Sequence, residues 1–128
     1  MSFLINNRDP VYLQVVRYFK ERIATGELAG GQEIPPRREL AGLLKINPNT
    51  AQKAYKEMEE QGLIYTERNF PSRVTTDEKI LNGVREELIQ EAVDAFILAV
   101  KPIQVPVDEL VDIVKKNYLT VEKLGGEI

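Results

Sequence analysis

The stretch from residue 46 to residue 58 constrains the fold most, because it predicts a short helix with two different faces. Asn47 is a good N-cap, and Pro48 suits the first helical position, where a missing N–H group costs nothing. Small and apolar side chains recur at helical spacing on a stripe that would face a core: Ala51, Ala54, Tyr55 and Met58. The other face carries amide, hydroxyl and ammonium groups, the types that reach bases and phosphates in a DNA major groove: Asn49, Thr50, Gln52, Lys53 and Lys56.

The composition excludes several kinds of site. The 128 residues include no cysteine and no histidine, which rules out disulfides, thiol catalysis, Ser-His-Asp triads and the common zinc sites. With 43% hydrophobic residues, the chain is able to bury a real core. We therefore expect a folded protein that is not an enzyme and that uses no cofactor and no metal.

The net charge of −3 hides an uneven distribution along the chain. Residues 1–76 carry 11 Lys and Arg against 9 Asp and Glu, whereas residues 77–128 carry 6 against 11. Between residues 34 and 56, five basic residues stand against one acidic residue, which gives a net charge of +4. Such a local basic patch is the electrostatic footprint of a nucleic-acid binder, so the acidic balance of the whole chain does not exclude DNA.

The apolar runs of the chain are short. The segment before Asp9 has only three consecutive strongly apolar residues, too few for the core of a signal peptide. The longest apolar run, residues 95–100, is too short to span a bilayer. We therefore expect a soluble cytoplasmic protein with no membrane partner.

The first 76 residues predict three helices followed by a small hairpin. An Asp9-Pro10 start and a stop at Gly26 bound the first helix, and residues 37–44 and 48–61 form the next two. Only Lys45-Ile46 connect the second helix to the third, as in a helix-turn-helix motif. Two short strands are expected beyond the third helix, over residues 63–66 and 73–76. The expected fold is mainly α with a small β-hairpin, a winged helix-turn-helix domain over residues 1–76.

The order of these motifs closely resembles the DNA-binding domain of the GntR family of bacterial transcriptional regulators. The resemblance covers roughly residues 9–76 and rests on residues 10–12, 26–28, 31, 34–41, 46–55, 59 and 62–64. The Asn-Pro-Asn-Thr start of the third helix, with Tyr55 inside it, looks most like the YtrA-like branch. The resemblance to that branch implies a regulator without a large effector domain, in which two helices after the wing serve dimerisation. It also implies binding to an operator in double-stranded DNA, usually as a repressor.

We expect the third helix to enter the major groove and the wing to lie along the duplex. Arg38, which matches an arginine of the family, would discriminate bases together with Asn49, Thr50, Gln52 and Lys53; for Lys53 the alternatives are a guanine and a phosphate. The other expected DNA contacts go mostly to phosphates: Arg37, Lys45, Tyr55 through its hydroxyl, Lys56 and Arg68.

The sequence departs from the family pattern at three places. Pro36 stands where the family has a serine that would cap the second helix. The tip of the wing, residues 68–73, has no glycine, although Asn69 is able to adopt a left-handed conformation. Arg73 replaces the usual aromatic residue beside the last valine of the wing. Either Arg68 or Arg73 would therefore have to supply the contacts of the wing to DNA.

From Asp77 onward the helical period returns and predicts a dimerisation segment over residues 77–128. A long helix is expected over residues 78–100, and a second amphipathic helix follows Pro102 and Pro106. Exposed apolar stripes on such a hairpin are best explained by pairing with a second copy of the chain. The alternative is that the hairpin folds back on its own chain. The expected contacts of the homodimer are Leu81, Val84, Leu88, Ala92, Phe96, Leu110 and Val114.

Other hypotheses stay open at the level of the sequence. Glu87, Glu91 and Asp94 recur at helical spacing and could hold a hard cation, although such acidic stripes are more often solvated or ion-paired. The altered wing also allows a winged-helix protein-interaction module with weak or lost DNA binding, but such a module has no evident need for the basic patch. A small-molecule effector at the dimer interface is a further expectation, and no residue identifies it.

Overall fold

The structure is a computed structural model in which residues 3–123 are described. The chain divides into two compact units, one that extends to Gln90 and one that begins at Glu91. We call the first unit the head and the second the tail. The head is larger than the domain predicted over residues 1–76, because it includes the first half of the long helix that follows the wing.

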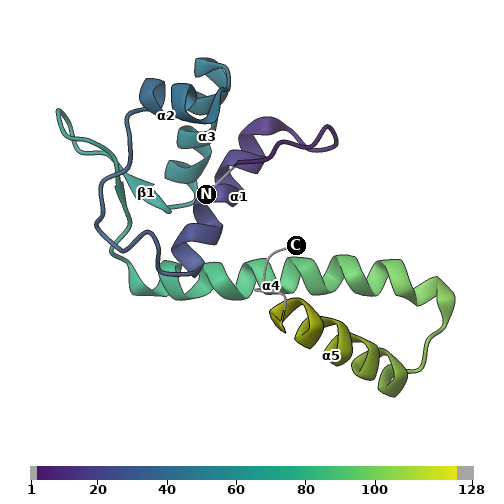
Figure 1. Cartoon of the computed structure of the whole chain (residues 1–128). Coiled ribbons are helices and arrows are strands. Elements are labelled where there is room, and N and C mark those ends of the chain that lie inside the picture. Colours follow the sequence, from purple (N-terminus) through teal and green to yellow (C-terminus); the bar gives the residue numbers. More distant parts are fainter. Residues whose placement is uncertain (1–2, 124–128) are drawn as a thin grey trace. The chain divides into compact units, whose positions relative to one another are not determined.

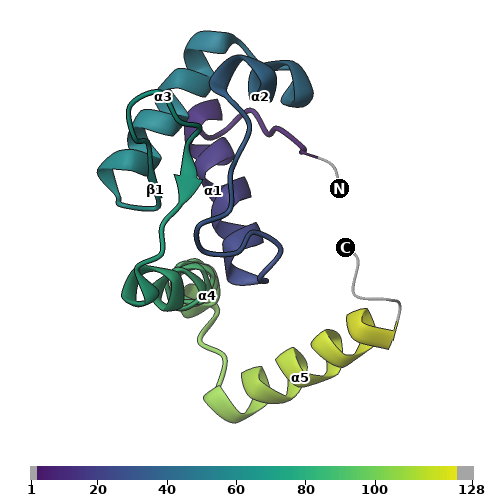
Figure 2. The ribbon, with the colours of Figure 1, turned by 90° about the vertical axis from the view of Figure 1, so that its left-hand side faces the viewer.

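Over its described residues, the head consists of three helices, a two-stranded wing and the start of a fourth helix. Figures 1 and 2 show these elements. The third of these helices contacts both of the first two, so the head packs around it. The mainly helical winged fold expected from the sequence is confirmed. The elements are α1 (Val11–Ala24), α2 (Arg37–Leu44), α3 (Pro48–Glu60), β1 (Ile64–Tyr65), β2 (Arg73–Val74) and α4 (Glu78–Val100), of which α4 begins in the head and ends in the tail.

The strands of the wing are shorter than the sequence predicts. They form two antiparallel pairs, Ile64 with Val74 and Tyr65 with Arg73. Beyond Tyr65 the hydroxyl oxygens of Thr66 and Ser72 lie 2.6 Å apart and join the strands through side chains. The backbone ladder does not continue toward the tip because Pro71, which precedes Ser72, has no N–H group to donate.

The inner faces of α1 and α3, the wing and the start of α4 together form the core of the head. Its most deeply buried large side chains come from these four elements: Val15, Tyr55, Met58, Val74 and Val84. Gly62 ends α3 with a φ of +75°, and the next N–H group, that of Leu63, donates to the Met58 carbonyl at 2.9 Å. This turn leads the chain from α3 directly into the wing.

The start of α4 packs against the head of its own chain, which corrects part of the predicted dimer interface. Val84 is 2% exposed and belongs to the core, and Leu81 and Leu88 are half-buried against it. A Cβ atom on Gly30 would lie 3.0 Å from the Leu81 side chain, so the turn before α2 fits closely against α4. Leu81, Val84 and Leu88 therefore pack in the head instead of on an exposed surface, which is the fold-back alternative for this half of the helix.

The tail contains the end of α4, a short 3-10 helix, η1 (Lys101–Ile103), and α5 (Val107–Lys123). After α4 the chain reverses its direction before α5 begins (Figure 1). None of the described side chains of α5 is buried, and Phe96, Leu98 and Val114 are also exposed in the single chain. Over the described residues, no helix has both the length and the apolar character needed to cross a membrane.

Candidate nucleic-acid interface

The local sequence of α3 fixes which of its faces reaches the surface. The Asn47 side chain accepts a hydrogen bond from the Asn49 N–H at 2.7 Å, and Pro48 occupies the first turn, as the cap prediction requires. Ala51 and Ala54 are completely buried against the rest of the head. Because a helix turns once in 3.6 residues, the side chains between these positions point outward. The exposed or half-exposed polar residues of this face are Asn49, Thr50, Gln52, Lys53 and Lys56.

The turn between α2 and α3 places Lys45 at the surface in an unusual conformation. Lys45 is exposed and has a φ of +57°, in the left-handed region that residues with a side chain rarely adopt. The N–H group of Ile46 then donates to the Ala41 carbonyl at 3.0 Å, and Ile46 packs against the core. Lys45 is therefore an exposed cation in the turn that leads into α3.

The two arginines at the start of α2 have different surroundings. The Arg37 guanidinium forms an ion pair with Glu59 at 2.6 Å and lies 4.9 Å from the centroid of the Tyr55 ring. Arg38 is exposed, and no ion pair or hydrogen bond engages its side chain within the described part of the chain. Glu59 on α3 holds the Arg37 side chain against the protein, so the geometry lends no support to the predicted phosphate contact of Arg37. Arg38 is the one that remains available to DNA.

Tyr55 is a core residue in this structure. Its side chain is 0% exposed, and its hydroxyl donates a hydrogen bond to the Pro35 carbonyl. Burial raises the pKa of the Tyr55 hydroxyl above its ordinary value, so this group stays protonated as a donor. The predicted contact between the Tyr55 hydroxyl and a phosphate finds no support in this geometry, because the hydroxyl is buried and already donates its hydrogen bond to the Pro35 carbonyl.

Lys53 is exposed but has a neighbour on another helix. Its ammonium nitrogen lies 4.2 Å from the centroid of the Tyr12 ring, in the first turn of α1. Tyr12 is half-buried against the core. In the sequence, the only sign of a role for Tyr12 beyond the core is its place in the Pro10-Val11-Tyr12 motif. Its partner on α3, Lys53, lies 41 residues away, so helical periodicity does not reveal the contact.

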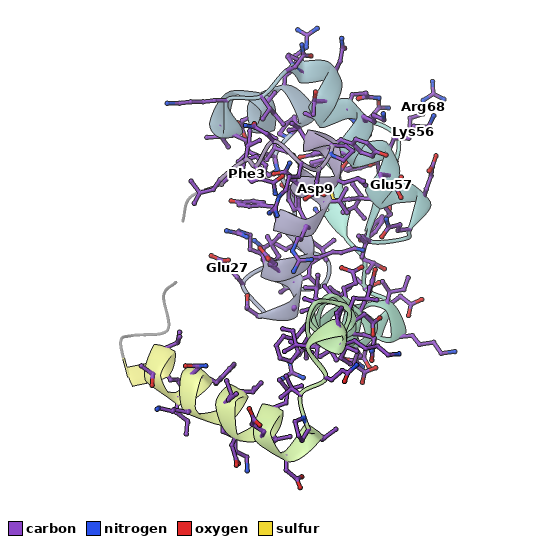
Figure 3. All side chains as sticks on the ribbon, turned by 90° about the vertical axis from the view of Figure 1, so that its right-hand side faces the viewer. Phe3, Asp9, Glu27, Lys56, Glu57 and Arg68 are labelled. Atoms are coloured by element: carbon purple, nitrogen blue, oxygen red, sulfur yellow. The ribbon has the colours of Figure 1, made fainter. Side chains whose placement is uncertain are left out.

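The two arginines of the wing also have different surroundings. Arg73 donates to the Glu33 carboxylate at 2.8 Å and to the Gly31 carbonyl at 2.9 Å, so it fastens the base of the wing to the segment before α2. Arg68 is exposed at the tip, and Figure 3 shows it projecting from the same side of the head as Lys56. Asn69 takes the left-handed conformation at the tip, with a φ of +68°. Of the two alternatives for the wing, the geometry favours Arg68.

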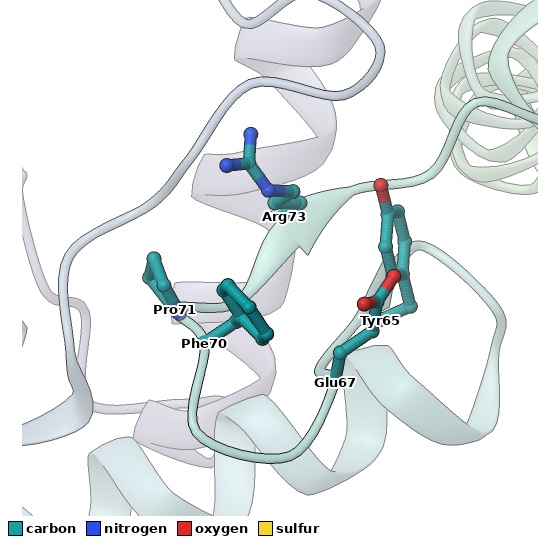
Figure 4. Close-up of a pocket in the computed structure, with 5 residues that line it drawn as sticks. All are labelled: Tyr65, Glu67, Phe70, Pro71 and Arg73. Atoms are coloured by element: carbon teal, nitrogen blue, oxygen red, sulfur yellow. The ribbon is translucent and has the colours of Figure 1, made fainter.

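The wing also forms a small hollow of about 190 Å³, shown in Figure 4. Two aromatic rings, those of Tyr65 and Phe70, contribute to its walls, and Phe70 is 61% exposed. The complete lining is Tyr65, Glu67, Phe70, Pro71 and Arg73. Arg73, the one cation of this lining, is already bonded to Glu33 and to the Gly31 carbonyl.

The acidic stripe of α4 does not assemble a metal site in the described residues, where no three carboxylates lie close enough to share an ion. Glu87 instead accepts a hydrogen bond from the Lys20 ammonium at 2.8 Å. This ion pair connects α1 to the part of α4 that belongs to the head. Structural pairing therefore explains Glu87 better than cation binding does.

The tail half of the predicted dimer interface lies at the surface of the single chain. Phe96 is 41% exposed and Val114 is 43% exposed, and Ala92 is also exposed. Leu110 is half-buried. These four residues are therefore available for contacts with another chain, unlike the three that pack in the head.

Known proteins resemble this chain in sequence and in structure. The family model described as "Bacterial regulatory proteins, gntR family" matches residues 11–74, from the start of α1 to the end of β2. A protein of Bacillus subtilis (strain 168), the HTH-type transcriptional repressor YtrA, is 35% identical over 98 residues, which cover 72% of this chain and 75% of that protein. A match of this length extends beyond the wing into α4.

Two solved structures show the same arrangement. A GntR family transcriptional regulator from Listeria monocytogenes has a TM-score of 0.83 at 30% identity, over 88% of this chain and 98% of that one. AraR(DBD), solved in complex with the operator ORX1, has a TM-score of 0.51 at 27% identity, over 59% of this chain and 90% of that one. On the family match and on the winged helix-turn-helix that carries it, this chain belongs to the gntR family of bacterial regulatory proteins.

Proposed function

We propose that this protein is a sequence-specific transcriptional regulator, acting as a repressor, that binds a pseudo-palindromic DNA operator as a homodimer. The observation that carries the proposal is the exposed polar face of α3, whose opposite face is wholly buried. A helix held this rigidly is able to present Asn49 and Gln52 to base edges in a major groove. The relatives described above are named as regulators, and AraR(DBD) was solved with an operator, which supports the same role here.

Positive charge surrounds this face and supplies affinity for the DNA backbone. Lys45 lies at the turn before α3, Lys56 one turn beyond Gln52, and Arg38 on the neighbouring helix. All three side chains are exposed. Contacts of such side chains with phosphates release counterions, so the affinity should fall steeply as salt is added.

The tail supports the homodimer in this proposal. Residues 92–100 of α4 are apolar apart from one aspartate, and no side chain in that stretch is buried in the single chain. A helix that is apolar on most of its circumference is normally covered by other protein. Leu98 is 74% exposed and Tyr118, on α5, is 70% exposed. A second copy of the chain would cover these surfaces and bring two heads to one operator.

A two-fold dimer predicts the form of the operator. Each α3 would occupy one major groove, with the two half-sites about one helical turn apart, or ~34–36 Å. The half-sites would be related as an inverted repeat, because the symmetry of the protein is matched by the symmetry of the DNA.

The test of this proposal removes two exposed cations of the head, with Arg38→Ala and Lys53→Ala combined in one chain. We expect duplex binding to be lost while the melting temperature stays within about 2 °C of the wild type, since substitutions at exposed side chains rarely change stability by more than about 0.5 kcal/mol. Lys79→Ala, which removes an exposed cation from α4, is the matched control and should bind as the wild type does. Undiminished binding by the double variant would contradict the proposed interface.

A further inference from the structure

The contact between Lys53 and Tyr12 assigns a role to a residue outside the helix-turn-helix. The ammonium of Lys53 lies over the Tyr12 ring, 4.2 Å from its centroid. A cation at this distance from the face of an aromatic ring is attracted by the negative charge density of that face. The lysine stem has four rotatable bonds and is exposed, so without this ring its ammonium would sample many positions.

Tyr12 itself is held firmly, because the chain leading into α1 is fixed by a network of hydrogen bonds. The Gln14 side chain donates to the Asp9 carbonyl at 2.8 Å and accepts from the Asn6 N–H at 2.9 Å. The Asn6 side chain accepts from the N–H groups of Arg8 and Asp9 at 2.9 and 3.0 Å. Tyr12 is also partly buried and packs against the core. The ring is therefore a rigid platform for the lysine.

The position of the ring decides where the Lys53 ammonium lies. Asn49 and Gln52 share the exposed face of α3 with Lys53, but only Lys53 is drawn toward α1. We propose that Tyr12 is a positioning residue, which holds the Lys53 ammonium at the α1 side of the interface so that it contacts a DNA phosphate and not a base. This inference rests on the proposed DNA-binding function and chooses between the two contacts that the sequence leaves open for Lys53. Discrimination between bases then falls to the other expected base contacts, among them Asn49 and Gln52.

Holding the Lys53 ammonium in place before DNA binds should increase the affinity for DNA. A lysine that is free in the unbound protein loses rotamer entropy when it engages DNA, whereas one already held over a ring loses less. The gain should be roughly two- to fivefold in affinity, the range expected for a cation over an aromatic ring at an exposed site. This gain in affinity should require both the Tyr12 ring and the Lys53 ammonium.

A double-mutant cycle on the full-length chain tests this inference. The probe is the duplex that the wild type retains most strongly from a randomised pool. Tyr12→Leu keeps an apolar side chain against the core but removes the ring, and should weaken binding by roughly two- to fivefold. Tyr12→Phe keeps the face of the ring and should bind as the wild type does, because the Tyr12 hydroxyl makes no hydrogen bond to any described residue. In the Lys53→Ala background, Tyr12→Leu should have no further effect on affinity.

The same experiment distinguishes failure of this inference from failure of the proposed DNA-binding function. The inference is wrong if Tyr12→Leu weakens binding equally with and without Lys53, or if Tyr12→Phe is as harmful as Tyr12→Leu. It is also wrong if Lys53→Ala changes which base pairs are retained, since a phosphate contact carries no base information. If the wild type retains no duplex at low salt, the proposed function fails and this inference fails with it. If the wild type binds but the cycle is additive, only the inference fails.

Discussion

The Arg37 guanidinium lies 2.6 Å from the Glu59 carboxylate and ties the first turn of α2 to the last turn of α3. The same guanidinium lies over the Tyr55 ring, whose hydroxyl donates to the carbonyl of Pro35 just before α2. These contacts fix the angle between the two helices of the helix-turn-helix. Arg38, the next residue along α2, takes no part in them and is exposed.

The neighbouring arginines should therefore respond oppositely to truncation. Arg37→Ala removes an ion pair that is about one-third exposed and a ring contact, together worth about 1 kcal/mol after allowing for solvent screening. A loss of that size would lower the melting temperature by about 4–8 °C for a unit of this length, as thermal unfolding monitored by circular dichroism would show. Arg38→Ala should leave the melting temperature unchanged and weaken duplex binding by roughly tenfold or more. The reverse pattern would mean that the roles of the two arginines are exchanged.

Substitution of Lys45 by glycine should stabilise the fold but weaken the binding of DNA. Its φ of +57° is strained for a residue with a side chain, so Lys45→Gly should raise the free energy of unfolding by up to about 1 kcal/mol. The same substitution removes a cation from each protomer and should reduce the slope of log affinity against log salt by about 2 per dimer. Lys45→Gln, which removes the charge but keeps the strain, is the control and should change the slope alone. If the slope is unchanged in both variants, Lys45 does not contact a phosphate.

Gln52 and Lys56 provide a comparison within α3. Gln52→Ala should relax the preference at one base pair of each half-site, at ~1–3 kcal/mol, because it removes a side chain that is able to bond an adenine through two hydrogen bonds. Lys56→Ala should lower the affinity for every sequence alike and reduce the salt slope. Sequencing of the DNA retained by each variant from the same randomised pool measures both effects. An equal loss across all sequences for Gln52→Ala would remove it from the residues that contact bases.

Substitutions test which apolar residues of α4 and α5 stabilise the head and which contact a second chain. Phe96→Glu and Val114→Glu place charges on apolar surfaces of the tail, and should convert the dimer to a monomer in sedimentation equilibrium without unfolding the head. Lys116→Glu lies on the opposite face of α5 from Val114 and should leave the dimer intact. Val84→Asp, at a side chain that is 2% exposed, should instead unfold the head. A dimer that survives both glutamate substitutions would place the interface elsewhere.

The sequence predicts the elements of the head well because their signals are local. Asn47 and Pro48 mark the start of α3, and Gly62 marks its end, so the helix was expected within one residue of its observed bounds. The winged arrangement follows from the short turn at Lys45 and from the two brief strands. Each of these features depends on residues that are neighbours in the chain.

The roles of individual side chains depend on partners far away in the sequence, and the sequence does not reveal them. Arg37 and Arg38 look equivalent until Glu59, 22 residues away, is found beside only one of them. The leucines and valines of α4 form one continuous pattern, yet Val84 packs in the head while Phe96 is exposed. Tyr55 fits the buried stripe from its spacing alone, but its hydroxyl bond to Pro35 becomes visible only in three dimensions.

The measurement that tests the account most directly is a titration of the full-length protein against a randomised duplex pool at two salt concentrations, followed by sequencing of the retained DNA. We predict enrichment of an inverted repeat whose half-sites are about one helical turn apart, and a steep loss of retention at the higher salt. Failure to retain any duplex at low salt, or retention without a repeated half-site, would contradict the proposal of a dimer that uses α3 to bind a specific operator.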